Sequence, residues 1–206
     1  LELLGAAGEC ACRELTELTG ASSSTFSRLE KLGLITLWEQ EVQPELLSPA
    51  EQSAQPPVLN DEQQAAFDGL RLQMQGQKPG AALLYGVTGS GKTAVYIRLI
   101  YEALQEGKSA ILLVPEISLT PQLLGRLSAH FGETVAVLHS SLRISERFAQ
   151  WRRIQSGQAR VVVGTRSAVF APVQNPGLFI LDEEQEHTYK SENSPRYHAR
   201  EIALYR

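Results

Sequence analysis

Short apolar runs alternate with helical patterns throughout residues 59–206. The apolar runs are continuous and partly β-branched, as strands buried on both faces of a parallel sheet are. These predicted strands are 82–87, 110–114, 135–138, 161–163 and 178–181. The predicted helices between them each stop at a glycine and are 92–106, 120–131 and 144–156. This alternation predicts a doubly wound α/β domain with a parallel sheet.

The residues before this domain follow a different pattern. Residues 9–37 suggest a helix, a turn, a second helix and a strand-like segment, with the first helix at 13–18 and a break at Gly20. The second helix, within SSSTFSRLEKLG, has serines suited to an N-cap and ends at Gly33. We therefore expect a small winged-helix module over residues 1–40, and a proline-containing polar linker over residues 41–58.

Charge is distributed unevenly between these parts. The formal net charge is −4, but residues 1–57 hold three basic and nine acidic residues, a net of −6. Residues 58–206 hold 16 basic and 14 acidic residues, a net of +2. The helix-turn-helix pattern therefore leaves two hypotheses open, a DNA reader or a packing module, because the negative charge opposes phosphate contacts.

Cysteine content and hydropathy limit the cellular compartments in which the protein is expected. Cys10 and Cys12 are too few for a disulfide scaffold or a four-ligand zinc site within this chain. No apolar run approaches the ~20 residues that a membrane span needs, and no signal peptide opens the sequence. We expect a soluble protein of the reducing cytoplasm that does not bind membranes.

The stretch GVTGSGKT follows a predicted strand and opens a predicted helix, which is the context of a phosphate-binding P-loop. Its backbone N–H groups would face the phosphates, Lys92 would reach the β and γ oxygens, and Thr93 would ligate Mg²⁺. The predicted nucleotide-binding residues in this loop are Gly86, Val87, Thr88, Gly89, Ser90, Gly91, Lys92 and Thr93.

Acidic and amide side chains complete the predicted nucleotide site. Asp182 follows an apolar strand and would hold Mg²⁺ through water, and Glu183 would polarise the attacking water. Gln63, upstream of the P-loop, could pair with the donor and acceptor edges of adenine, although a solvent-facing glutamine at a helix start is the alternative.

Stretches at the carboxyl ends of other strands suit contacts with a phosphate backbone. LLVPEISLTPQ (112–122) and VVVGTRSAVFAP (161–172) place hydroxyls and backbone amides beside turns, and the second contains Arg166. Arginines between them could also bind phosphate, or could simply form a solvated helix face.

Together, LNDEQ, GVTGSGKT, LLVPEISLTPQ, LHSSL, GTRSAVFAP, LDEEQ and TYKSENSPRYHARE resemble the PriA family of primosomal replication-restart proteins, which are superfamily 2 DNA helicases. The resemblance runs through almost all of residues 59–206 and implies a RecA-like motor lobe that uses ATP and Mg²⁺. It implies that Lys92, Asp182 and Glu183 are catalytic. Partners implied are single-stranded or forked DNA, the primosome and single-strand-binding proteins.

The resemblance also assigns a DNA surface. The segment from Tyr189 to Arg200 corresponds to an aromatic-rich loop that senses single-stranded DNA and couples it to ATP hydrolysis. The DNA-binding residues expected on this basis are Thr165, Arg166, Ser167, Tyr189, Lys190, Arg196, Tyr197 and Arg200. The family's DEEH box reads DEEQ here, and Gln185 can donate and accept a hydrogen bond but cannot become charged.

By the same resemblance, a DNA-fork-binding domain would precede residue 1. A second motor lobe, with an arginine finger and zinc-binding cysteines, would follow residue 206. We therefore expect a fragment without zinc that binds ATP but hydrolyses it slowly, because phosphoryl transfer needs an arginine from the other lobe.

Other functions remain open on the sequence. The main rival is an ATP-responsive regulator in which a helix-turn-helix reads duplex DNA. A small-molecule kinase is a third alternative, but the sequence has no lid or acceptor-site signature after the second acid. Residues 191–201 are expected to form a loop that orders on DNA. Tyr189 and Tyr197 would stack on bases or, alternatively, pack beneath the edge of their own domain.

Overall fold

The computed structural model describes residues 12, 16, 19–37, 55–76, 78–87 and 89–206. The chain divides into two compact units, residues 1–42 and 43–206. In the described residues, no helix is both long enough and apolar enough to cross a bilayer.

In the described part of the smaller unit, helix α3 (Ser23–Lys31) is complete, and Cys12, Thr16 and Thr19 are helical as well. Its end is closed by bonds from Gly33 N to Glu30 O (2.9 Å) and from Leu34 N to Leu29 O (3.0 Å), with Gly33 at φ 68°. The predicted second helix and its glycine stop are thus confirmed. Of the predicted helix at 13–18, only Thr16 is described, and it is helical. The winged-helix module stays a prediction.

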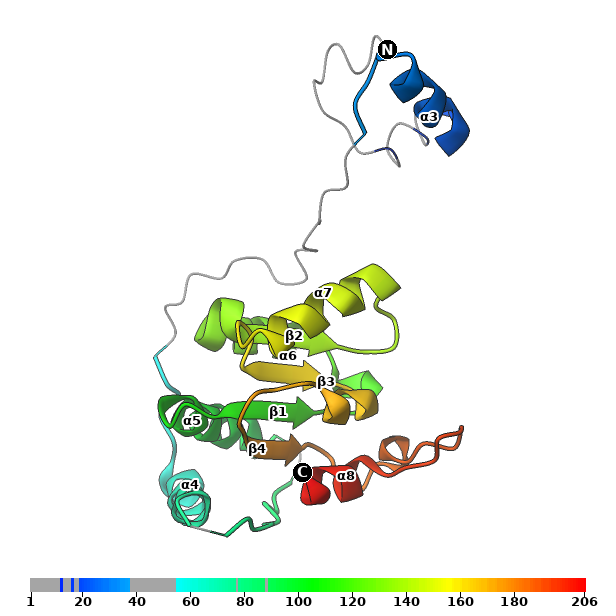
Figure 1. Ribbon diagram of the computed structural model, residues 1–206. Coiled ribbons are helices and arrows are strands. Elements are labelled where there is room, and N and C mark those ends of the chain that lie inside the picture. The colour runs from blue at the N-terminus through cyan, green and yellow to red at the C-terminus, as the bar shows by residue number, and fades with distance from the viewer. Residues whose placement is uncertain (1–11, 13–15, 17–18, 38–54, 77, 88) are drawn as a thin grey trace. The chain divides into compact units, whose positions relative to one another are not determined.

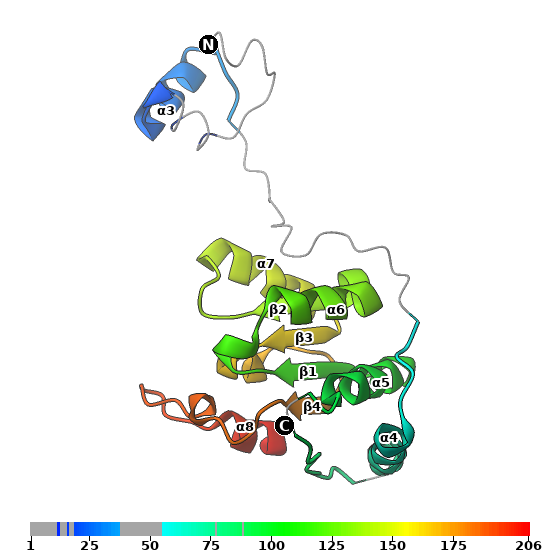
Figure 2. The same ribbon diagram turned by 180° about the vertical axis from the view of Figure 1, so that it is seen from behind.

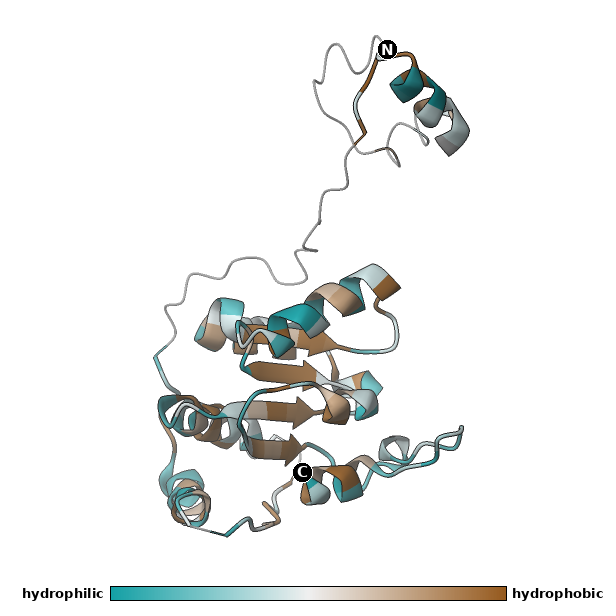
Figure 3. Ribbon diagram, viewed as in Figure 1, coloured by the Kyte–Doolittle hydropathy of each residue, from teal (hydrophilic) through white to brown (hydrophobic). Residues whose placement is uncertain are grey.

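The larger unit is built on a four-stranded, fully parallel sheet with the order β2-β3-β1-β4 (Figure 1). Its strands are β1 (Ser109–Leu113), β2 (Val135–Leu138), β3 (Val161–Gly164) and β4 (Pro176–Leu181). The strands consist of valine, leucine, isoleucine and other apolar residues for most of their length, and Figure 3 shows them as the most hydrophobic part of this unit. The prediction of a doubly wound parallel sheet is confirmed.

Helices cover both faces of this sheet. Alternate strand residues point to opposite sides, so both faces of these apolar strands need to be buried. Leu112 packs with α5 (Lys92–Gln105) and α6 (Pro121–Phe131) in one hydrophobic cluster. Ile111 and Leu113 pack in a second cluster with α7 (Ile144–Gln155), η3 (Arg166–Phe170) and α8 (Ala199–Tyr205). Figures 1 and 2 show these layers from opposite sides. Shorter turns are η1 (Glu116–Ser118), η2 (Gly132–Thr134) and η4 (His187–Tyr189).

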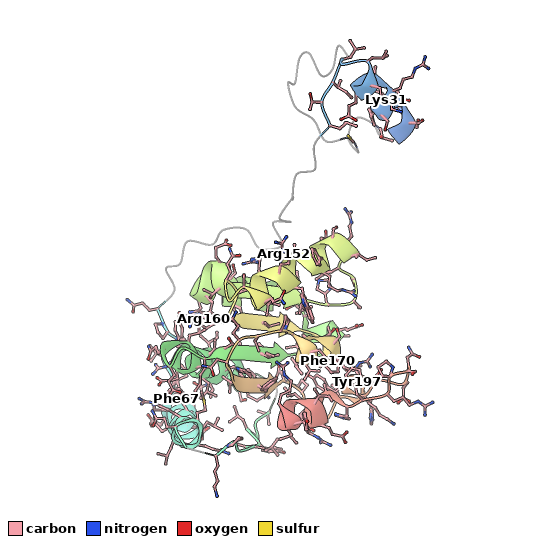
Figure 4. All side chains as sticks on the ribbon, in the orientation of Figure 1. Lys31, Phe67, Arg152, Arg160, Phe170 and Tyr197 are labelled. Carbon is pink, nitrogen blue, oxygen red and sulfur yellow. The ribbon has the colours of Figure 1, made fainter. Side chains whose placement is uncertain are left out.

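A further helix, α4 (Asp61–Met74), packs against α5 rather than against the sheet. Its anchor is Phe67, which is 1% exposed and contacts Val95 and Leu99. The Arg98 guanidinium lies 5.0 Å from the centroid of the Phe67 ring. Phe67 is labelled in Figure 4. The helix that follows the P-loop is therefore packed between α4 and the sheet.

The predicted strand at 82–87 is wrong. This segment belongs to no strand, and the sheet ends at β4. Leu83, Tyr85 and Val87 are 77%, 91% and 74% exposed, and only Leu84 packs against the hydrophobic clusters. The physical reason is that an apolar run becomes a strand only where it pairs with a neighbour, and this run does not pair with β4.

Replacing Phe67 with alanine should lower the free energy of unfolding by about 3 to 5 kcal/mol, because a buried ring is removed from between α4 and α5. Urea unfolding followed by circular dichroism measures this change. The control is Leu72→Ala on the same helix, where the side chain is 74% exposed and little change is expected. Equal losses in the two variants would contradict the packing of α4 described above.

Candidate nucleotide and nucleic-acid site

The P-loop precedes α5 and uses glycines where other residues would be strained. Gly89 and Gly91 both have φ of 81°, and Gly91 is the N-cap of α5. A Cβ atom on Gly91 would clash with Nε2 of Gln63. The loop therefore needs glycine at residue 91 for its backbone conformation, whereas the flexible end of Gln63 can shift away from a Cβ atom.

Lys92 has its ammonium group inside this loop. Its Nζ donates to the carbonyl oxygens of Gly86 (2.8 Å) and Val87 (3.3 Å). The same ammonium, together with the backbone N–H groups at the start of α5, suits the oxygens of a polyphosphate. A phosphate would replace the two carbonyl oxygens as the partner of Lys92.

Gln63 lies against the P-loop, and both the nitrogen and the oxygen of its side-chain amide already form hydrogen bonds within the protein. Nε2 donates to Ser90 O (2.9 Å), and Oε1 accepts from the backbone N–H of Asn60 (3.1 Å). Gln63 therefore joins the start of α4 to the P-loop. Its role in reading adenine stays a prediction, and it would require the amide to leave at least one of these partners.

The acidic residues begin where β4 ends. The Asp182 N–H donates to Leu113 O at the end of β1 (2.9 Å), and Asp182 Oδ1 accepts from the Tyr96 hydroxyl (3.1 Å). Tyr96 lies on α5, one turn after Thr93, and residues at this spacing share a helix face. The structure thus brings Asp182 to the first turns of the helix that carries Thr93.

The hydroxyl of Tyr96 remains a hydrogen-bond donor at neutral pH. Burial and then the nearby Asp182 carboxylate raise the pKa of Tyr96 above its ordinary value. Tyr96 was not expected at the site because its position fits the apolar face of α5. No motif in the sequence marks its hydroxyl.

Glu183 occupies an unusual backbone position directly after Asp182. Its φ is 48°, in the left-handed region, and its Oε2 accepts from Gln185 Nε2 at 2.7 Å. The amide of Gln185 therefore orients the carboxylate that is predicted to polarise water. A strained residue at this place is typical of functional turns.

The protein groups fit a cation that also binds phosphate. Among the described residues, no three His, Cys, Asp or Glu side chains gather into a metal-binding group. Mg²⁺ in phosphate sites keeps several waters and takes only one or two protein ligands besides the substrate oxygens. The Thr93 hydroxyl and the Asp182 carboxylate, the two predicted Mg²⁺ ligands, match this number of protein ligands, and their role stays a prediction.

A cavity of about 230 Å³ opens where β1 and β3 end. Its lining combines hydroxyl groups, one guanidinium and one carboxylate, and consists of Val114, Pro115, Glu116, Ser140, Thr165, Arg166, Ser167, Thr188 and Tyr189. Four of the predicted DNA-binding residues are thus together. Glu116 and Ser140 share a hydrogen bond of 3.0 Å. Neither was named as a DNA-binding residue, although Glu116 lies in the predicted stretch 112–122 and Ser140 closely follows a predicted strand.

Tyr189 lies in the core, and its predicted role as an exposed stacking surface does not hold in this structure. It is 1% exposed, and its hydroxyl lies 2.9 Å from Leu113 O and 2.6 Å from Asp182 O. Burial and then the Asp182 carboxylate raise the pKa of Tyr189. Tertiary contacts explain why Tyr189 is buried, because its ring packs in the same hydrophobic cluster as Ile111 and Leu113 of β1.

Tyr197 is only partly buried. Its ring meets that of Phe170 edge to face at 4.9 Å, and Figure 4 shows the two side chains next to each other. The Arg166 guanidinium lies 5.9 Å from the Tyr197 ring centroid. Of the two predicted stacking residues, Tyr189 and Tyr197, Tyr197 is therefore the one that a base could reach with less movement of the protein.

The predicted DNA-binding cations differ in their partners within the protein. Arg166 Nη1 donates to Thr188 O (3.0 Å) and Lys190 O (2.6 Å), and Arg200 pairs with Glu184. Lys190 pairs with Glu192 at 3.4 Å on the surface, and Arg196 is exposed. Phosphate would have to replace protein partners at Arg166, Lys190 and Arg200.

Residues 191–201 have defined contacts without DNA, contrary to the expectation that this segment orders only on DNA. Ser191 N donates to Tyr197 O (2.7 Å), and Lys190 and His198 form an antiparallel bridge. The segment then continues directly into α8. The bridge closes it into a loop beside the end of the sheet.

Residues 60–203 match the DEAD/DEAH box helicase family. Similar proteins include the replication restart protein PriA of Bacillus subtilis (strain 168), 45% identical over 194 residues, which are 94% of this chain and 24% of that protein. Replication restart protein PriA of Treponema pallidum (strain Nichols) is 49% identical over 151 residues, 72% of this chain and 22% of its own length. The chain spans about a quarter of the length of these relatives.

Gly91→Ala should lower the free energy of unfolding by about 1 to 2 kcal/mol, the cost of a left-handed conformation at a residue with a side chain. Gly125→Ala, the control within α6, should raise it by about 0.5 to 1 kcal/mol, because that site is helical and open. Urea unfolding of both variants measures the difference. Stabilisation by Gly91→Ala would show that the loop does not need its glycine.

Proposed function

The chain belongs to the DEAD/DEAH box helicase family, and on that premise we propose that it carries the ATP-binding lobe of a replication-restart DNA helicase. The observation that carries the proposal is the Tyr96–Asp182 hydrogen bond, because it brings the acid after β4 to the helix that begins with the P-loop. The similarity to replication restart proteins supports the biological role.

In this proposal each residue of the nucleotide site has one task. Backbone N–H groups of residues 86–93 bind the phosphates, and Lys92 exchanges its carbonyl partners for the β and γ oxygens. Thr93 and Asp182 hold Mg²⁺, which neutralises charge on the phosphates when bound. Glu183 accepts a hydrogen bond from the attacking water, and Gln185 holds the Glu183 carboxylate in place.

Single-stranded or forked DNA is the proposed polymer. The hydroxyls of Thr165 and Ser167 and the guanidinium of Arg166 suit sugar and phosphate contacts at the cavity, which carry no sequence preference. Lys190, Arg196 and Arg200 would bind the flanking phosphates. Tyr197 would offer its ring to a base.

The cellular setting follows from the same role. A replication-restart helicase acts on the chromosome, so we place the protein in the cytoplasm. The primosome and single-strand-binding proteins are the proposed protein partners. The contribution of residues 1–40 to DNA binding is part of the same proposal, as placement rather than affinity.

ATP binding is tested with Lys92→Ala, which should abolish the fluorescence increase of a methylanthraniloyl ATP analogue in the presence of Mg²⁺. Lys78→Ala, at an exposed lysine outside the P-loop, is the matched control and should bind normally. Turnover by residues 1–206 alone is expected to be slow, because an arginine supplied in trans typically contributes about 10³ to 10⁵ in rate. Robust DNA-stimulated hydrolysis by this chain would contradict slow turnover.

DNA binding is tested with Arg196→Ala, which should weaken single-strand binding equally for all sequences and lower the salt slope by about 1. Fluorescence anisotropy of labelled oligonucleotides at several salt concentrations measures both quantities. Arg126→Ala, an exposed arginine on α6, is the control. A preference for one particular duplex sequence would instead support the ATP-responsive helix-turn-helix regulator.

A further inference from the structure

Asp182 is held by tyrosines from two different elements. From α5, the Tyr96 hydroxyl donates to the Asp182 carboxylate at 3.1 Å, and Tyr96 is 7% exposed. From η4, the Tyr189 hydroxyl lies 2.6 Å from the main-chain oxygen of Asp182, and Tyr189 is 1% exposed. One phenol therefore contacts the side chain and the other contacts the backbone of the same acid.

We propose that Tyr96 and Tyr189 are positioning residues that fix the carboxylate and the main chain of Asp182 for the cation of a bound nucleotide. This inference rests on the proposed ATP site. It adds two residues that touch neither nucleotide nor cation and act only through Asp182.

The contact of Tyr96 restricts how the carboxylate can turn. The phenol occupies Oδ1 and leaves Oδ2 for a water of the cation, and outer partners of this kind commonly orient ligating carboxylates. Packing alone does not require the hydroxyl, because the ring belongs to a cluster of apolar side chains. A phenylalanine would fill the same space and leave Oδ1 without this donor.

The contact of Tyr189 restricts the backbone. A phenol has one proton, and two carbonyl oxygens lie within reach of it, those of Leu113 and Asp182. The phenol proton is assigned to Asp182 O because this contact is the shorter one, and Leu113 O accepts from the Asp182 N–H at 2.9 Å. Asp182 is thereby tied at its N–H to β1 and at its carbonyl to η4.

The same two tyrosines connect Asp182 to both binding regions. Tyr96 is on the helix that begins at the P-loop, and Tyr189 lines the cavity of about 230 Å³. The carbonyl of the next residue, Lys190, accepts from Arg166 at 2.6 Å. The position of Asp182 is therefore set by contacts from the nucleotide side and from the cavity side.

The test is a Mg²⁺ titration of the chain with the methylanthraniloyl ATP analogue. Tyr96→Phe should raise the half-saturating Mg²⁺ concentration by roughly 10- to 100-fold, as loss of an outer partner does at other metal sites. Affinity for the analogue in EDTA should not change, whereas a general loss of structure would lower it. The control is Tyr101→Phe on the same helix, whose hydroxyl donates to His130 O (3.1 Å) rather than to Asp182.

A second pair of variants separates positioning from packing. In an Asp182→Asn background, Tyr96→Phe should produce no further shift in the Mg²⁺ curve, because its effect passes through the carboxylate. Tyr189→Phe, which keeps the buried ring, should shift the curve in the same direction as Tyr96→Phe. Circular dichroism confirms that each variant is folded.

Several results would overturn the inference. A Mg²⁺ curve for Tyr96→Phe that matches the unmutated chain would remove the role of its hydroxyl, and so would an equal shift in the Asp182→Asn background. An unchanged curve for Tyr189→Phe would remove the backbone anchor. If the unmutated chain shows no Mg²⁺-dependent binding of the analogue, the proposed ATP site itself fails, and this inference fails with it.

Discussion

The parallel pairing of β1 with β3 and β4 is the constraint on which the site depends. Every residue of β1 is buried, and its last residue, Leu113, pairs with Gly164 on one side and Leu181 on the other. The residues that follow the three strands consequently leave the sheet at one edge. Because both faces of β1 are covered by apolar clusters, a shift of register would also misplace those clusters. Core packing therefore fixes where Asp182 and the residues after β3, which include Arg166, leave the sheet.

At this edge the cationic side chains already have partners within the protein. Lys92 is bound by carbonyl oxygens of its own loop, and Arg166 by carbonyl oxygens of the η4 region. Among the described residues, no buried side-chain nitrogen or oxygen lacks a hydrogen bond. A phosphate that binds here would exchange one set of acceptors for another, so only the difference between the two sets contributes to affinity. Charge-assisted bonds to phosphate favour that exchange, because they are stronger than bonds to neutral carbonyl groups.

The sequence was sufficient to predict the four strands that the sheet contains and the helices between them, since each is an apolar run or a helical pattern bounded by turn residues. Residues 82–87 have the same apolar character and yet form no strand. Hydropathy reports that a segment can be buried, but pairing depends on a neighbouring strand edge, which no local pattern records. Tyr189 illustrates the same limit, because the carbonyl groups that its hydroxyl meets include one 76 residues away along the chain.

The proposed nucleotide site shows which kinds of residue a motif can point to. Lys92 and Asp182 carry groups whose chemistry suits phosphate and metal, so their type and spacing point to a role. Tyr96 sits in the apolar stripe of α5, and by its position alone it is a core residue. Its hydroxyl gains meaning only because β4 ends beside α5 and places Asp182 within 3.1 Å. A residue that orients a ligand is selected by its neighbours in space, so the residues that position Asp182 were found only once the sheet and α5 had been placed together.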